Sequence, residues 1–355
     1  MNRRTAPALI LCVCLAAGCR SAPPPTAGDA EEVARLLASL ACRDAKARAA
    51  AADALVRIGP RVLFQLCPCI RDHLADADEH AWRAAYGVEE RIAVRYQDDP
   101  HLDDYYRAQK PVKLSVMRAT LPGGRTMEFV RIPAGSYVQG SSNPGTGLVM
   151  AQDMPCNYAP IRKVTISRPF WMGRDVVTQQ QWGALMRVNR CREKVPHYPV
   201  DTLSWDEAMA FCRKLSRLNP PHRFTLPTEA QWEHACRAGT TSRHAFGNRR
   251  LLKGDYRLRA GGEWYENRFG LRHIHNLVFE WCSDWFGAYS TDAVVDPTGP
   301  KAGSYRSVRS NYRFCSAAEC RSAHRSGFPP EPRNGIGFRV ACPALAGGTA
   351  FADAK

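Results

Sequence analysis

The sequence predicts a mixed α+β fold in which a small α-helical segment precedes a larger domain of short strands, turns and capped helices. Apolar residues recur at helical spacing over residues 30–108, whereas from residue 110 onward strand-like runs alternate with turns. The 26 glycines, 25 prolines and 8 tryptophans among 355 residues indicate a turn-rich domain with large aromatic side chains in its core. A chain of this length can bury a core of ordinary size.

The first residues resemble a bacterial lipoprotein leader. Arg3 and Arg4 precede an apolar stretch over 6–17 that is too short to span a bilayer as a mature helix. Small residues then lead to Cys19, as in a lipobox, although Ala16 stands where leucine is commoner. We therefore expect a signal peptide over 1–18, a flexible tether over 19–29, and an exported protein held at the membrane, on the cell-envelope side, by a lipid on Cys19. The alternative is an ordinary signal peptide that contains a cysteine by chance.

Residues 30–108 are predicted to form a small helical segment. Val33, Leu36 and Leu40 keep a helical period, which Gly59-Pro60 interrupts. The run 44–59 resembles the second half of a HEAT-type helical repeat. One or two such units are fewer than an independent solenoid needs, so we expect this segment to pack on the larger domain or to act as its spacer.

The formal net charge of +15 could attract nucleic acid, anionic lipid or acidic glycans. No run of Lys and Arg is dense enough for a nucleic-acid site, so we expect no nucleic-acid partner. The alternative explanation of the charge is a genome that encodes arginine often. The sequence also lacks Gly-rich phosphate loops, G-x-S-x-G elbows and H-E-x-x-H zinc motifs.

Fourteen cysteines are present, of which eleven remain after Cys12 and Cys14 of the leader and the anchor Cys19 are set apart. In an exported protein we expect some of the eleven to pair as disulfides. The odd number leaves at least one outside an intramolecular pair, and the sequence does not determine the pairing.

Within the larger domain, Ser and Thr residues stand where they would cap helices. The predicted helices begin after Thr178, Ser204 and Thr228, and the predicted strands lie within 127–141 and 163–173.

The stretch 224–241 contains Leu-Pro-Thr-Glu-Ala-Gln-Trp-Glu and closely resembles the L-P-T-E-A-E-W-E signature of the formylglycine-generating enzyme (sulfatase-modifying factor) family. Further motifs of that family follow its order over residues 112–343, among them 177–182, 199–212, 280–285, 320–325 and 334–339. The resemblance implies a distorted C-type-lectin-like domain with little regular secondary structure over 110–345. We expect the last residues, 346–355, to be a disordered tail. It also implies an activity, in which copper and oxygen convert a cysteine of a sulfatase-type protein or peptide substrate into formylglycine.

Catalytic members of that family bind copper through two cysteines in a C-x-x-x-x-C arrangement, and Cys315 and Cys320 have this spacing. Thiolates are the soft ligands that monovalent copper prefers. The flanking residues depart from the family pattern, because 310–312 read Ser-Asn-Tyr where catalytic members have Gly-Gly-Ser. Cys315 and Cys320 are therefore candidate catalytic copper ligands, or else they form a disulfide or are buried structural thiols.

The resemblance also implies a calcium site. Glu280 and Asp284 keep the carboxylates of a calcium-binding segment of the family, but Leu277 replaces its asparagine. Independently, the planar guanidinium groups of Arg325 and Arg339 could hold a substrate carboxylate or backbone. The alternatives are solvated or salt-bridged carboxylates and arginines that tie loops together.

Aromatic and imidazole side chains of the domain are given structural roles. We expect His273 and His275 to face solvent. Six tryptophans within the motifs are expected to pack in the core: Trp171, Trp182, Trp205, Trp232, Trp281 and Trp285.

Two functions follow from the sequence. The first is an exported enzyme that generates formylglycine, with Cys315 and Cys320 as copper ligands. The second is a non-catalytic family member that binds a peptide or a glycan as a scaffold module at the cell envelope. The fold does not distinguish them.

Overall fold

The computed structural model describes residues 27–42, 44–59, 62, 83–85, 88, 91–92, 114–141, 160–245, 266–275, 277–311 and 320–345. Cys19, Cys315 and the tail 346–355 lie outside these residues. Within the described part of the chain, no helix is long and apolar enough to cross a membrane.

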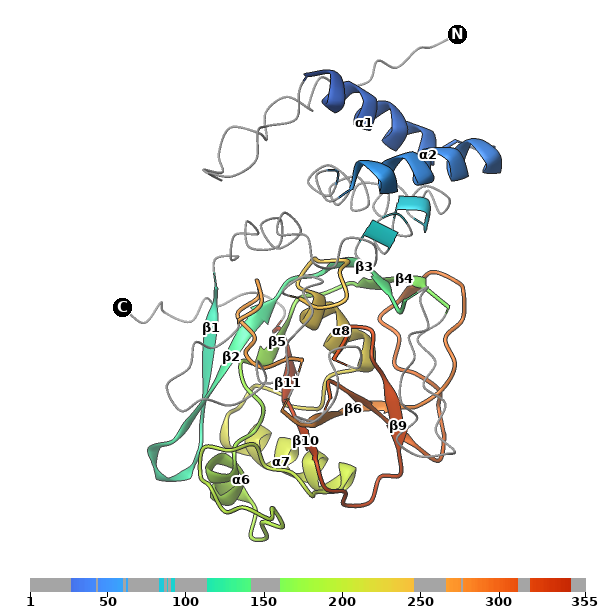
Figure 1. Cartoon of the computed structure of the whole chain (residues 1–355). Coiled ribbons are helices and arrows are strands. Elements are labelled where there is room, and N and C mark those ends of the chain that lie inside the picture. The colour runs from blue at the N-terminus through green and yellow to red at the C-terminus, as the bar shows by residue number, and fades with distance from the viewer. Residues whose placement is uncertain are drawn as a thin grey trace.

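Within the described residues, helices precede the larger domain, as the sequence predicts for 30–108, although most of 60–113 lies outside those residues. Helix α1 (Ala27–Leu40) packs against α2 (Ala45–Ile58), which begins after Asp44, whose side chain accepts a hydrogen bond from the Lys46 N–H group. Their buried residues form one apolar cluster with Val138 of the larger domain. Arg83 adds hydrogen bonds of 3.1 Å to two backbone carbonyls of that domain, at Ile161 and Thr291. The helical segment therefore packs on the domain (Figure 1).

Three small sheets form the frame of the larger domain. The first is antiparallel and has the order β1 (Val116–Thr120), β2 (Thr126–Ile132), β5 (Phe170–Gly173), β11 (Ala341–Pro343). The second has the order β10 (Ile336–Phe338), β6 (Phe279–Trp285), β8 (Arg306–Arg309), β9 (Ser326–Phe328), with β10 and β6 parallel. The third has the order β3 (Gly135–Gln139), β4 (Arg162–Ile166), β7 (Val294–Val295), with β4 and β7 parallel. The last strand of the chain thus closes the sheet that the first strand of the domain opens.

Three helices of the domain begin where the sequence predicts. Thr178, Ser204 and Thr228 each cap a helix, and in each case the side chain three residues later completes a capping box by accepting from the cap's own backbone N–H. These helices are α6 (Gln179–Leu185), α7 (Trp205–Leu218) and α8 (Glu229–Arg237). Helix α8 ends where Ala238 and Gly239 adopt positive φ angles of 48° and 83°.

The two strand predictions are confirmed with changes. The strands predicted within 127–141 are β2 and β3, and they belong to different sheets. The run 163–173 splits into β4 and β5 at 167–169, where Pro169 has no N–H group to give to a sheet ladder.

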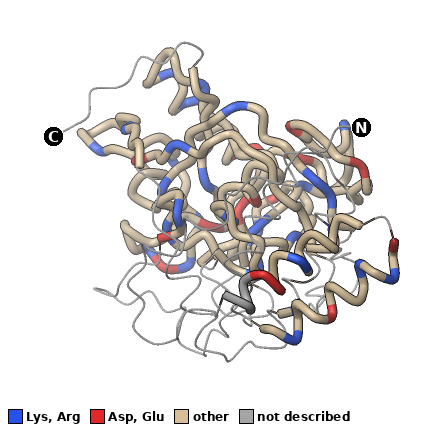
Figure 2. The backbone as a smooth tube through the Cα atoms, turned by 90° about the horizontal axis from the view of Figure 1, so that it is seen from above, with Lys and Arg blue, Asp and Glu red and all other residues tan. Residues whose placement is uncertain are grey.

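Aromatic side chains fill the centre of the domain. Trp182, Trp232 and Trp281 are fully buried, as predicted, whereas Trp171, Trp205 and Trp285 are half-buried. The Trp182 ring stacks on Phe211 with ring centroids 5.8 Å apart, which joins α6 to α7. Lys and Arg are spread along the chain with Asp and Glu between them (Figure 2).

Candidate functional site

Helix α8, which carries the family signature, places three charged side chains inside the protein. Glu229, Glu233 and Arg237 follow one another at intervals of four residues and therefore lie on one face of the helix. Their exposed fractions are 4%, 0% and 2%. Charges buried this deeply need partners, because desolvation of an unpaired carboxylate is costly.

Arg325 is the main partner of Glu229. Its Nε and Nη2 atoms donate to the two carboxylate oxygens at 2.5 and 2.8 Å, and the Tyr289 hydroxyl and the Ser307 hydroxyl donate at 2.9 and 3.0 Å. Burial alone would raise the pKa of Glu229, but Arg325 and Arg309 lower it to about 2. Glu229 is therefore ionised at every physiological pH.

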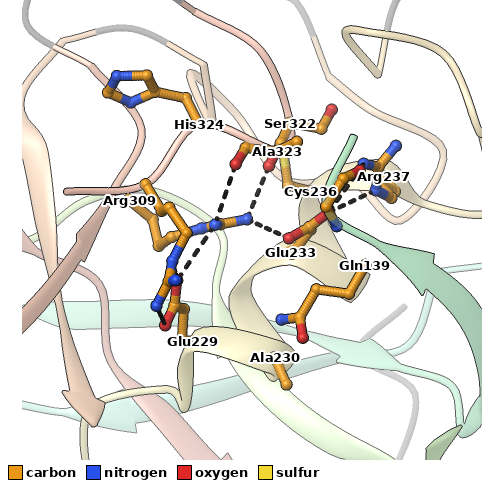
Figure 3. A network of polar contacts seen from close by, with 12 residues as sticks. Gln139, Glu229, Ala230, Glu233, Cys236, Arg237, Arg309, Ser322, Ala323 and His324 are labelled. Atoms are coloured by element: carbon orange, nitrogen blue, oxygen red, sulfur yellow. Dashed lines mark hydrogen bonds and ion pairs between the residues drawn. The ribbon is translucent and has the colours of Figure 1, made fainter. Parts of the chain in front are cut away.

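Glu233 pairs with two arginines (Figure 3) and accepts a hydrogen bond from a backbone amide. Arg309 Nη2 donates to one carboxylate oxygen at 2.5 Å, while Arg237 Nε and the Gly140 N–H group donate to the other at 2.9 and 3.0 Å. Arg309 also donates to the Ser322 carbonyl at 2.8 Å. We name Glu229, Glu233, Arg237, Arg309 and Arg325 the α8 charge network; it joins α8, β8 and the segment before β9.

A second buried ion pair lies beside Trp232. The Trp232 Nε1–H group donates to Glu280 Oε2 at 2.7 Å, and Arg339 donates from Nε and Nη2 to the two Glu280 oxygens at 3.2 Å each. The remaining Arg339 donors reach the carbonyls of Gly173, Arg174 and Arg272 at 2.7–2.9 Å. Glu280 and Arg339 are both fully buried.

The two arginines predicted to bind a substrate, Arg325 and Arg339, take part in these buried contacts. Arg325 and Arg339 are 1% and 0% exposed, and carboxylates and carbonyls of the protein itself engage their guanidinium groups. The geometry favours the alternative given by the sequence, in which both arginines tie loops together.

The predicted calcium ligands do not fit a calcium ion. Both Glu280 oxygens are taken up by Arg339 and Trp232, and Asp284 Oδ2 accepts from the Glu229 N–H at 2.9 Å and from the Ser283 hydroxyl at 3.0 Å. Burial, and then the neighbouring Glu229 carboxylate, raises the pKa of Asp284 to about 7. Calcium needs several ionised or carbonyl oxygens around one point. Over the described ranges, no group of three or more His, Cys, Asp or Glu side chains could hold a metal ion.

Only one of the two predicted copper ligands can be placed. Cys315 lies outside the described residues, whereas Cys320 is described and is 1% exposed. Five other cysteines are buried thiols outside any disulfide: Cys191, Cys212, Cys236, Cys282 and Cys342. Burial raises the pKa of Cys236 to about 12, so this thiol is not a reactive thiolate. The expected disulfides do not involve these five.

The expectation that His275 faces solvent is wrong. Its side chain is 3% exposed, and its Nε2 atom accepts from the Ala245 N–H at 2.8 Å. The ring proton must therefore sit on Nδ1, which donates to the Cys320 carbonyl at 2.9 Å. Burial keeps the pKa of His275 well below its usual value. His273 is also partly enclosed, and burial lowers its pKa to about 4.

Sequence reasoning missed the α8 charge network. The spacing of Glu229, Glu233 and Arg237 was a usable signal, because three charges on one helix face are either a solvated stripe or a buried cluster. Nothing local marks Arg309 as their partner, since it follows Glu233 by 76 residues.

Comparisons with known proteins agree with the sequence motifs. Residues 117–344 match the family described as "Sulfatase-modifying factor enzyme 1-like domain". A formylglycine-generating enzyme of Streptomyces coelicolor is 33% identical over 180 residues, which are 41% of this chain and 53% of that enzyme. The chain spans about half the length of this and another curated relative.

Two solved structures share the fold. Treponema denticola variable protein 1 aligns with a TM-score of 0.53 at 25% identity, over 64% of this chain and 99% of that one. PvdO from Pseudomonas aeruginosa aligns with a TM-score of 0.50 at 21% identity, over 67% of this chain and 100% of that one. The chain therefore belongs to the sulfatase-modifying factor (formylglycine-generating enzyme-like) family.

Asp284 provides a test of the buried charges through the dependence of stability on pH. Its folded pKa of about 7 lies above the usual 3.8, so its contribution to stability is complete below about pH 4 and is lost as the pH rises through 7. We expect Asp284→Asn to raise the free energy of unfolding at pH 8, relative to the unchanged protein, by about 2–4 kcal/mol more than at pH 4. Urea unfolding at both pH values measures this difference. The exposed control Asp292→Asn should show no such difference, and an equal effect of both substitutions would contradict the assignment.

Proposed function

We propose that this chain is a non-catalytic member of its family, which serves as a peptide- or glycan-binding scaffold module at the cell envelope. One observation carries the proposal: Glu280, Arg325 and Arg339, which were predicted to bind calcium or a substrate, are buried and pair with charged side chains of the protein itself. Glu280 and Arg339 pair at 3.2 Å, and Arg325 pairs with Glu229 at 2.5 Å. Their charges stabilise the fold, so they are not available to hold a substrate or a calcium ion.

The environment of Cys320 supports the same proposal. A cysteine that binds copper and meets a substrate needs an accessible thiolate. Cys320 is 1% exposed, and its backbone carbonyl holds the buried His275 ring. Ser310, which stands where the resemblance has glycine, is held at φ 65° with a buried hydroxyl. A serine with this positive φ angle raises the free energy of the fold by roughly 1–2 kcal/mol, a cost that glycine does not have. Ser310 is thus a departure from the family pattern beside the cysteine pair.

The spacing of Cys315 and Cys320 favours a second candidate function, the copper- and oxygen-dependent conversion of a substrate cysteine to formylglycine. The names of the relatives, formylglycine-generating enzymes, point the same way. If this function is present, the two thiols would hold the copper, and copper would supply the activation of oxygen.

Copper titration decides between the two functions. We expect the mature chain to bind no monovalent copper tightly through Cys315 and Cys320, and to form no aldehyde on a cysteine-containing sulfatase-type peptide. Competition with a chromogenic copper chelator and mass spectrometry of the peptide measure the two quantities. Cys42→Ala, which removes an exposed thiol of the helical segment, is the control for Cys315→Ala/Cys320→Ala. One copper per chain that the double variant loses and the control retains, together with aldehyde formation, would refute the scaffold proposal.

We further propose that the chain is exported and anchored by a lipid on Cys19. The basic, apolar and small-residue order of residues 3–19 supports this proposal. We expect Cys19→Ala to move the chain from the membrane fraction to the soluble fraction of a bacterial host. Unchanged fractionation of the variant would contradict lipid anchoring.

A further inference from the structure

The outer side of α6 and α7 carries exposed arginines. On α7, Arg213 and Arg217 are exposed while Phe211 and Leu215 are buried, so the two arginines lie together on the solvent side of the helix. Arg187 is exposed two residues after the end of α6. Val188 and Leu218, next to these arginines in the chain, are 52% and 50% exposed.

These residues belong to one surface, because α6 and α7 pack side by side. The Trp182 and Phe211 rings stack between the helices, and Lys214 Nζ donates to the carbonyl of Leu185, the last residue of α6, at 2.8 Å. This bond brings the segment that follows α6 to the middle of α7. We name Arg187, Val188, Arg213, Arg217 and Leu218 the α6–α7 basic face.

The arginines of this face have no acidic partner within the part of the chain that the structure describes. The nearby acid Glu207 is already paired with Arg190 at 2.7 Å. Arg213 and Arg217 stand four residues apart, a spacing at which like charges repel across one helical turn.

We propose that the α6–α7 basic face binds a polyanionic glycan, whose carboxylate or sulfate groups pair with Arg187, Arg213 and Arg217. Guanidinium groups bind planar and tetrahedral anions through paired N–H donors, which suits repeated acidic groups along a sugar chain. The exposed apolar part is confined to two aliphatic side chains, whereas a helix that enters a lipid surface has a broad apolar face. Helices α6 and α7 lie at the end of the molecule opposite to α1 and α2 (Figure 1), where the helical segment does not cover them. This inference deepens the proposed binding role and rests on it.

The experiment measures binding of the full chain to dextran sulfate, with uncharged dextran as the neutral probe. The variant Arg187→Ser/Arg213→Ser/Arg217→Ser removes three charges from the face. The matched control, Arg35→Ser/Arg131→Ser/Arg168→Ser, removes three exposed charges elsewhere. We expect the unchanged protein and the control to bind dextran sulfate with an affinity that falls as salt increases, and the face variant to lose at least about tenfold in affinity at 0.15 M salt.

Equal losses in both triple variants, or no loss in the face variant, would overturn the assignment to this face. Stronger binding to phosphatidylglycerol vesicles than to dextran sulfate, lost in the face variant, would overturn the assignment to a glycan. Either result leaves the scaffold proposal intact, because that proposal fails only by the copper and aldehyde measurements. Circular dichroism of each variant confirms that the exposed substitutions leave the fold in place.

Discussion

The domain depends on the buried ion pairs that the carboxylates of α8 make with arginines from other elements. Glu233 binds Arg309 of β8, and Glu229 binds Arg325 just before β9, at 2.5 Å in both pairs. A buried pair adds little net stability when it is compared with well-packed apolar residues, but loss of one partner costs roughly 3–5 kcal/mol. The pairs therefore fix how α8 sits on the second sheet.

The family signature on α8 contains both carboxylates of these ion pairs, Glu229 and Glu233. A helix that begins with a Thr cap and contains a buried Trp already explains Thr228 and Trp232. The ion pairs explain the two glutamates of the signature as well, and the Trp232–Glu280–Arg339 contact explains Arg339 of the motif over 334–339. The fold thus explains the charged residues of these family motifs, which is why family membership alone does not establish an activity.

The features that could be predicted from the sequence are those set by contacts between residues close together in the chain. Helix starts at Thr178, Ser204 and Thr228 were predictable because a capping side chain acts on residues two or three positions away. The ion pairs were not predictable, because Arg309 and Arg325 follow their carboxylates by 76 and 96 residues and nothing in their neighbourhood marks them as buried. The family resemblance predicted the fold correctly. Of the Cys315–Cys320 pair, on which the predicted activity depends, Cys315 lies outside the described residues.

A double-mutant cycle on Glu229 and Arg325 tests most directly whether these charges serve the fold. We predict that Glu229→Gln and Arg325→Met each lower the free energy of unfolding by about 3–5 kcal/mol, because each leaves a buried charge unpaired. The double variant should lose at least about 1 kcal/mol less than the sum of the single losses. A coupling energy below about 0.5 kcal/mol, with loss of peptide or glycan binding in Arg325→Met at unchanged stability, would contradict this account and return Arg325 to the binding site.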